Sequence, residues 1–211
     1  MDWIYVDWIR EFQARPTRRS LSTLVKMAIV HGLKTEITQH DQDIAASRTQ
    51  AVVNAANSRS FTNGDTGVSG ALRDANGGTH ESDRYSADLS RIESTTSTGG
   101  ASVQIARGKL SRNGVRYIIH GVGPNFSEHK DTGLLASAIT NSLDLCHTLG
   151  CTSVSIPFLS TGVYLGNKNL KDILELNSKT VRQWVEDNPH TWIRTIDMVR
   201  LVVPSSFQIG L

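Results

Sequence analysis

The feature that most constrains the fold is a short apolar run that ends abruptly in amide and small residues. Residues 51–54 read Ala-Val-Val-Asn, and residues 55–58 continue as Ala-Ala-Asn-Ser. A buried strand of a parallel sheet gives such an apolar run, and its carboxyl end opens into loops that can hold a ligand. Residues 156–164 repeat the pattern, with Ile-Pro-Phe-Leu followed by Ser-Thr-Gly-Val-Tyr. The sequence therefore predicts two strand ends that open at one edge of an α/β sheet.

Strands and helices alternate along the rest of the chain, which is typical of layered α/β domains. Apolar residues at helical spacing predict helices over 134–149, with a stop at Gly150, and over 170–187. Apolar and β-branched runs predict strands at residues 24–31, 34–39, 51–54, 102–106, 115–120, 153–157 and 198–203. Asn113-Gly114 predicts a hairpin turn between two antiparallel strands. Residues 79–97 are polar and weakly periodic, and they predict a surface helix with a long loop.

The first residues predict a helix outside the main domain. Ile4, Trp8 and Phe12 lie one turn apart, and the pattern stops before Pro16. The basic residues around Pro16 indicate a solvated linker rather than a binding patch. We therefore expect an N-terminal helix and linker over residues 1–20 and one main domain over residues 21–211.

Length and charge narrow the range of functions. A chain of 211 residues can bury one core. Lys and Arg outnumber Asp and Glu by only two, so no strong field attracts nucleic acid, and a nucleic-acid partner is not expected. The first residues lack the basic region of a signal peptide, and no apolar run reaches the length that spans a membrane. We expect a soluble monomer in the cytoplasm or nucleus, without a membrane partner.

The two cysteines do not indicate a metal site. Cys146 and Cys151 lack a second pair at zinc-finger spacing, so we expect reduced thiols in the core. Nothing else in the sequence calls for a metal or a cofactor. The sequence also lacks the Gly-x-x-x-x-Gly-Lys-Ser/Thr pattern that holds a triphosphate with magnesium, which excludes a P-loop nucleotide hydrolase.

Two loops of small residues are suited to bind an anion. Residues 63–70 lead into the apparent start of a helix at Ala71, where unpaired backbone amides and the positive end of the helix dipole favour a phosphate. Residues 160–164 offer consecutive amides that can curl around a second phosphate. Either loop alone could be an ordinary turn, because Gly and Asn are common wherever chains reverse. Together they predict a pyrophosphate site.

Several separate blocks of the sequence resemble the macro domain, a module that holds ADP-ribose, and particularly its alphavirus-type and hydrolase-type branches. The resemblance covers about residues 24–203. Its blocks are Asp-Ile-Ala at 43–45, Val-Val-Asn-Ala-Ala-Asn at 52–57, Tyr-Ile-Ile-His-Gly-Val-Gly-Pro-Asn-Phe at 117–126, and the run through Ser-Thr-Gly-Val-Tyr at 156–164. The resemblance implies an α/β fold with three α/β/α layers, in which helices flank a mixed central sheet, here with an N-terminal helical extension.

The same resemblance implies a binding site. The expected ADP-ribose ligands are Asp43, Ile44, Asn57, Gly67, Val68, Ser69, Ser160, Thr161, Gly162, Val163 and Tyr164. In this arrangement the carboxylate of Asp43 accepts the adenine amino group, and Ile44 gives a backbone contact. The Asn57 amide bonds the distal ribose, which packs beside Tyr164. The expected catalytic residues are Asn57, Asp65, Gly67 and Tyr164.

Some of these residues have simpler alternative roles. Asp43 could cap a helical turn, and Tyr164 could be a core aromatic. Asn54 is expected to bond the backbone around the strand end rather than a ligand. His120 is expected to be a satisfied core histidine, and Phe126 packs either near adenine or over the sheet.

One departure from the hydrolase-type pattern bears on catalysis. Those members show Val-Asp-Gly after a glycine run, whereas residues 68–70 here read Val-Ser-Gly, so Ser69 replaces the acid. A serine hydroxyl cannot act as a carboxylate base near neutral pH, and Asp65 is the possible substitute. Alphavirus-type members also lack the acid and are nonetheless regarded as mono-ADP-ribosyl hydrolases.

The leading hypothesis is hydrolysis of mono-ADP-ribose from modified Asp or Glu side chains, with mono-ADP-ribosylated proteins as partners. Two alternatives use the same site: a non-catalytic reader of ADP-ribosylated proteins, and an ADP-ribose 1″-phosphate phosphatase. A module for RNA or poly(ADP-ribose) is less favoured, because the chain is near neutral and has few aromatic residues.

Overall fold

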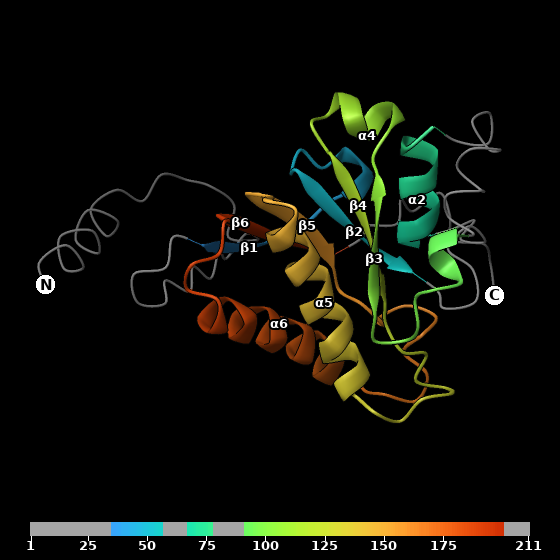
Figure 1. Cartoon of the computed structure of the whole chain (residues 1–211). Coiled ribbons are helices and arrows are strands. Elements are labelled where there is room, and N and C mark those ends of the chain that lie inside the picture. The colour runs from blue at the N-terminus through green and yellow to red at the C-terminus, as the bar shows by residue number, and fades with distance from the viewer. Residues whose placement is uncertain (1–34, 57–66, 78–90, 201–211) are drawn as a thin grey trace, which may run out of the picture.

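The computed structural model describes residues 35–56, 67–77 and 91–200. A six-stranded sheet forms the middle layer, in the order β1-β6-β5-β2-β4-β3 (Figure 1). Its strands are β1 (Glu36–Asp41), β2 (Ala51–Ala56), β3 (Ala101–Ile105), β4 (Tyr117–Val122), β5 (Ser153–Pro157) and β6 (Thr195–Arg200). All neighbouring strands are parallel except β3, which pairs antiparallel with β4. The predicted mixed sheet is therefore confirmed, and its parallel carboxyl ends share one edge.

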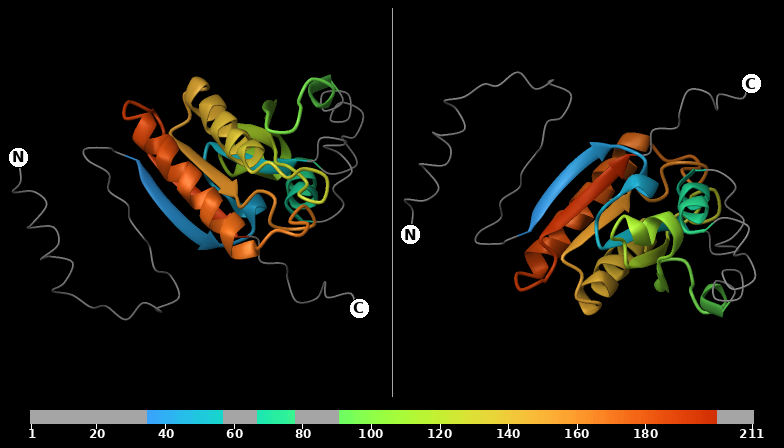
Figure 2. Two further views of the ribbon diagram at one scale, coloured as in Figure 1. Left: turned by 90° about the horizontal axis from the view of Figure 1, so that it is seen from below. Right: turned by 90° about the horizontal axis from the view of Figure 1, so that it is seen from above.

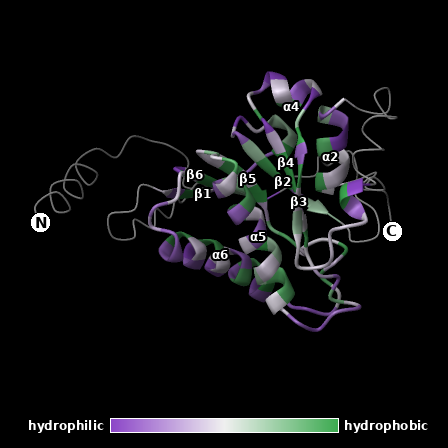
Figure 3. Cartoon of the chain, in the orientation of Figure 1, coloured by the Kyte–Doolittle hydropathy of each residue, from purple (hydrophilic) through white to green (hydrophobic). Residues whose placement is uncertain are grey.

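Helices α5 (Gly133–Thr148) and α6 (Leu170–Asp187) lie side by side on one face of this sheet (Figures 1 and 2). The larger core cluster lies between them and the strands, and it includes Leu135 and Ile139 of α5 and Val181 and Trp184 of α6. Hydrophobic and hydrophilic residues alternate along α6, as expected of a helix that covers a core on one side (Figure 3). Both predicted helices are thus confirmed within a few residues.

The opposite face is covered over its β2–β4 half. The 3-10 turn η1 (Ile44–Ala46), helix α2 (Gly67–Ala75) and the short helix α4 (Gly108–Arg112) enclose a second core cluster there. Ile44, Leu72 and Leu110 contribute one buried side chain from each of these elements. With helices on both faces of the sheet, the chain has the predicted three-layer α/β/α fold.

The connection between β3 and β4 differs from the prediction. The two strands are antiparallel, but α4 joins them in place of a two-residue hairpin turn. Asn113 is helical, with φ of −79°, and Gly114 has φ of +94°. A glycine with positive φ just after a helix is a common C-terminal stop, so the Asn-Gly pair ends a helix here. The dipeptide Asn-Gly is favourable both in a hairpin turn and at the end of a helix, so the sequence of these two residues alone does not decide between the two conformations.

Some sequence predictions concern residues that the structure describes, and others concern residues outside those ranges. The N-terminal helix, the linker, the strand at 24–31 and most of the segment 79–97 lie outside those residues, so the proposed division at residue 20 stays a prediction. The strand at 34–39 is found as β1, and the last strand begins three residues earlier than the pattern indicated. Cys146 and Cys151 are free and buried, as expected. No helix in the described ranges is long and apolar enough to cross a membrane.

Candidate functional site

The candidate site lies where the parallel strands β5, β2 and β4 end. These three strands are adjacent, so the loop after β5, the end of β2 and the residues after β4 are neighbours at the same edge. Turn η1 precedes β2 in the chain and contacts α2. Both η1 and α2 therefore lie near this edge. In open α/β sheets, ligands bind beyond the carboxyl ends of the strands. The fold therefore brings together the segments that the sequence singled out.

Asp43 caps turn η1, and Ile44 is the first residue of that turn. Oδ1 of Asp43 accepts a hydrogen bond of 2.9 Å from the Ala45 amide, so the capping role considered for Asp43 is present. Its Oδ2 has no hydrogen-bond partner among the described residues, and the residue is exposed. The Ile44 side chain is buried, but its N–H donates no hydrogen bond within the same ranges. A carboxylate oxygen and a backbone donor are thus available to a ligand side by side.

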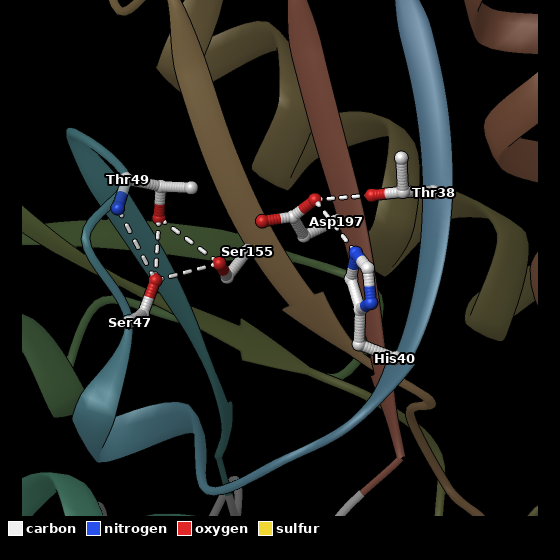
Figure 4. Close-up of polar contacts among 6 residues, drawn as sticks. All are labelled: Thr38, His40, Ser47, Thr49, Ser155 and Asp197. Carbon is white, nitrogen blue, oxygen red and sulfur yellow. Dashed lines mark hydrogen bonds and ion pairs between the residues drawn. The ribbon is translucent and has the colours of Figure 1, made fainter. Parts of the chain in front are cut away.

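Buried hydroxyls fasten the segment after η1 to the sheet (Figure 4). Ser47 Oγ lies 2.8 Å from Thr49 Oγ1 and 2.7 Å from Ser155 Oγ, and the two partners are 3.0 Å apart. Ser155 belongs to β5, so the cluster ties the segment between η1 and β2 to a central strand. On the neighbouring strands, Asp197 accepts a hydrogen bond from Thr38 and lies 3.8 Å from His40 Nε2. These contacts anchor the segments on either side of η1, because β1 precedes it and Ser47 and Thr49 follow it.

Helix α2 begins at Gly67, four residues earlier than the pattern indicated. Gly67, Val68 and Ser69 therefore form its first turn rather than the loop before it. The first amides of a helix have no intrahelical acceptors, and they point towards the N-terminal end. Val68 packs partly on the second core cluster, whereas Gly67 is exposed. Helix dipole and free amides together make this end suitable for an anion.

The loop after β5 is held in an uncommon backbone conformation. Ser160 has φ of +58°, the only positive value among the non-glycine residues described. Its buried hydroxyl donates a 2.8 Å hydrogen bond to the carbonyl of Pro124. A Cβ atom on Gly123 would lie 2.5 Å from Ser160 Oγ, so only glycine leaves room for this bond. A residue in the left-handed region turns the amides that follow it, as in an anion-binding nest.

The amides of this loop are available. Within the described residues, the N–H groups of Gly162 and Val163 donate no hydrogen bond. Thr161 is half-buried, and its hydroxyl donates to the Phe158 carbonyl, which folds the loop back on itself. Val163 is 93% exposed at the tip. The backbone of this loop can therefore donate to a bound group, as the sequence predicts.

Asn177 is a supporting residue that sequence reasoning missed. This buried side chain of α6 accepts from the Leu159 amide at 2.9 Å and donates to the Leu159 carbonyl at 3.2 Å. It clamps the residue next to Ser160. The available signal was an amide at helical spacing between Ile173 and Val181, both of which face the core.

Tyr164 closes the loop against the end of β4. Its carbonyl accepts a 2.9 Å hydrogen bond from the Phe126 amide, and its side chain is half-buried. Phe126 itself is buried in the larger core, which favours the sheet-covering role among the two considered. Lys168 lies 5.3 Å from the centre of the Phe126 ring. Tyr164 is therefore a half-buried residue of the loop rather than a fully buried core aromatic.

His120 and Asn54 form buried contacts under the site. His120 Nδ1 lies 3.1 Å from Asn54 Nδ2, and its Nε2 lies 3.1 Å from Gln104 Oε1. The prediction of a satisfied core histidine is confirmed. The backbone contact predicted for Asn54 was wrong, because its partners among the described residues are side chains: Oδ1 accepts from the Ser69 hydroxyl at 2.8 Å, and Nδ2 faces His120. The register of the parallel strands β2 and β4 pairs Asn54 with His120, which explains why Asn54 contacts this side chain rather than the backbone.

Two predicted residues cannot be placed. Asn57 and Asp65 lie outside the described residues, so their expected roles in ribose binding and catalysis stay predictions. The described part of the site consists of Asp43 and Ile44 on η1, Gly67 to Ser69 on α2, and the loop from Ser160 to Tyr164.

Comparisons with known proteins agree with this arrangement. The family model of the Macro domain matches residues 53–170. A macro domain-containing protein of Listeria monocytogenes is 36% identical over 166 residues, which cover 78% of this chain and 89% of that protein. A segment making up 4% of a polyprotein of Venezuelan equine encephalitis virus is 34% identical over 60% of this chain.

The solved structures show the same fold. A mutant of the Oceanobacillus iheyensis macrodomain, solved with ADPR, superimposes with a TM-score of 0.67 at 26% sequence identity, covering 81% of this chain and 88% of that one. The match of the family model to more than half of the chain, and the extended identity to the Listeria protein, establish the family. The chain is a member of the macro domain family.

Proposed function

We propose that this protein binds ADP-ribose and removes mono-ADP-ribose from modified Asp and Glu side chains. The observation that carries the proposal is that three sets of polar groups without a hydrogen-bond partner among the described residues lie at one sheet edge. These are Asp43 Oδ2 with the Ile44 amide, the first turn of α2, and the Gly162 and Val163 amides. Structures of the Oceanobacillus iheyensis macrodomain, one of a mutant with ADPR and one with ADP, support the choice of ligand.

The ligand can be oriented by the chemistry of these groups. An exocyclic amine donates to a carboxylate, so adenine is placed at Asp43, with Ile44 as a backbone donor. The diphosphate accepts from the α2 amides on one side and from the loop after Ser160 on the other. Its distal ribose then lies towards Tyr164 and the predicted position of Asn57. This orientation leaves the anomeric end of the ribose where water can approach.

Hydrolysis here needs little assistance to the leaving group. Water attacks the ester linkage, the bond between ribose and the side-chain carboxyl group breaks, and the products are ADP-ribose and the free side-chain carboxylate. A carboxylate with a pKa of about 4 leaves without prior protonation. Holding water and ester at the correct distance and angle therefore supplies most of the acceleration. Asp65 is proposed as the base that accepts the proton of the attacking water.

The test is the release of labelled ADP-ribose from an auto-modified transferase by the intact chain. Asp43→Ala is expected to weaken ADP-ribose binding, and unchanged affinity would refute the adenine assignment. Asp65→Ala is expected to slow turnover while leaving the affinity for ADP-ribose unchanged. Equal turnover in that variant would remove Asp65 from the mechanism.

A reader of ADP-ribosylated proteins is the second candidate, and the hydroxyl of Ser69 in place of an acid favours it. The same assay separates the two functions. No release at high protein concentration, together with retained ADP-ribose binding, would identify a reader.

A further inference from the structure

Four polar side chains form a continuous chain of contacts from the sheet edge to the candidate site. Gln104 lies on β3, His120 on β4, Asn54 on β2, and Ser69 in the first turn of α2 (Figure 1). Successive contacts measure 3.1 Å, 3.1 Å and 2.8 Å. The chain crosses three neighbouring strands on the face that α2 covers.

Burial makes the contacts of this chain obligatory. Gln104, His120 and Asn54 are 8%, 1% and 3% exposed. A buried polar atom without a partner costs about 1–3 kcal/mol, so each side chain is held in the orientation that satisfies its neighbours. Burial also lowers the pKa of His120 to about 3. Its ring is therefore neutral near neutral pH, with one nitrogen that donates and one that accepts.

With a neutral imidazole, the hydrogen bonds that link these four side chains can all be donated in one direction or all in the opposite direction. In one, Ser69 donates to Asn54 Oδ1, Asn54 Nδ2 donates to His120 Nδ1, and His120 Nε2–H donates to Gln104 Oε1. In the other, every donor and acceptor is exchanged. Asn54 turns its Oδ1 towards Ser69 and its Nδ2 towards His120 Nδ1, and Gln104 turns its Oε1 towards His120 Nε2, which is the arrangement of the first direction.

We propose that the chain runs in this first direction, so that Gln104, His120 and Asn54 are positioning residues that commit the Ser69 hydroxyl proton to the protein interior. The Ser69 oxygen then presents only lone pairs to the candidate site. Ser69 is half-buried, and the remaining acceptor capacity is open to an O–H donor. The inference rests on the proposed function for the identity of that donor, which is either a ribose hydroxyl or the attacking water.

The direction of the chain can be read without any ligand. Long-range nitrogen–proton correlation NMR on the intact, unliganded protein distinguishes the two imidazole tautomers. The His120 ring is expected to be neutral and protonated at Nε2 near neutral pH. A ring protonated at Nδ1, or an imidazolium, would overturn the proposal. The result does not depend on ADP-ribose, so it separates a failure of this inference from a failure of the proposed function.

A variant of Gln104 tests the positioning role. Gln104→Leu removes the acceptor and is expected to lower turnover by about fivefold, the factor for one hydrogen bond. Equal turnover in Gln104→Leu would contradict the role. Ser102→Ala, two residues away on β3, is the matched control, because the Ser102 hydroxyl has no partner among the described residues.

The variant Ser69→Ala identifies the group that donates a hydrogen bond to the Ser69 oxygen. If the donor is a ribose hydroxyl, the affinity for free ADP-ribose falls by about fivefold. If it is the attacking water, kcat falls with KM unchanged. Unchanged affinity and unchanged turnover would show that no donor meets Ser69, and the proposed acceptor role would be wrong.

Discussion

At the scale of single residues, Gly123 decides whether the loop after β5 keeps its conformation. An added Cβ would lie 2.5 Å from the Ser160 hydroxyl, which already sits in the left-handed region and bonds the Pro124 carbonyl. Gly123→Ala is therefore expected to displace Ser160 and to weaken ADP-ribose binding by about fivefold, as for one lost hydrogen bond.

The measurement for Gly123→Ala is calorimetric titration with ADP-ribose, compared with Gly133→Ala. Gly133 begins α5, and an added Cβ there approaches only the side chain of the exposed Asp131, at 3.0 Å. Wild-type affinity in Gly123→Ala would show that the Ser160 conformation is not required for binding.

His120 predicts a pH dependence of stability. Its pKa is lowered to about 3 by burial, whereas in the unfolded chain it returns to the ordinary value. Below that ordinary value the unfolded state binds the proton and the folded state does not, so this group lowers stability as the pH falls. The expected loss is roughly 2 kcal/mol between pH 7 and pH 5.

Denaturant unfolding across this range measures the His120 effect. His120→Gln should show a flatter dependence on pH, and His190→Gln, at an exposed position, should keep the wild-type slope. Identical slopes in the wild type and His120→Gln would mean that His120 is not the buried neutral group described above.

The position of the loop from Ser160 to Tyr164 could be predicted, because it follows a strand end that the apolar pattern marks, whereas Asp43 and Ile44 were singled out only by the resemblance to macro domains. Asn54 and Asn177 show where such prediction stops. The partner of Asn54 depends on which strand lies beside β2, and the role of Asn177 depends on how α6 meets the loop after β5. Both facts concern tertiary packing, which a single sequence does not encode in any local spacing.

At the scale of elements, the connection between η1 and β2 depends on three hydroxyls rather than on apolar contacts alone. Ser155→Ala removes the β5 partner of both Ser47 and Thr49. The expected loss of stability is about 1–2 kcal/mol, because buried hydroxyls lose a hydrogen-bond partner. Weaker adenine recognition should accompany it, since the segment carrying Asp43 loses its anchor.

Chemical unfolding of Ser155→Ala measures this loss. Ser137→Ala, at an exposed position on α5, should stay within about 0.5 kcal/mol of the wild type. If the two variants have the same free energy of unfolding, the hydroxyl cluster does not contribute to the stability of the fold.

Helices were predicted correctly where the apolar pattern extends over several turns. The prediction failed where a dipeptide occurs in two different kinds of structure. The stripes of α5 and α6 extend over several turns, so their helices are specified by many residues at once. Asn113-Gly114 is compatible with a hairpin turn and with a helix end. The choice depends on whether residues 108–112 pack Leu110 into the second core, which they do.

At the scale of the whole molecule, the sheet order brings segments from distant parts of the sequence to one edge. Turn η1 and the loop after β5 are more than a hundred residues apart in the chain, with α2 between them, and the parallel arrangement of β5, β2 and β4 brings all three to the same edge. Layering could be predicted from the alternation of elements. The sheet order could not, except through the resemblance to macro domains.

The most direct test of the account is titration of the intact chain with ADP-ribose while backbone amide signals are followed by NMR. We predict saturable one-to-one binding, with the largest shifts at Ile44, at Gly67 to Ser69, and at Gly162 and Val163. Absence of saturable binding, or shifts confined to residues away from the carboxyl ends of β5, β2 and β4, would contradict the account.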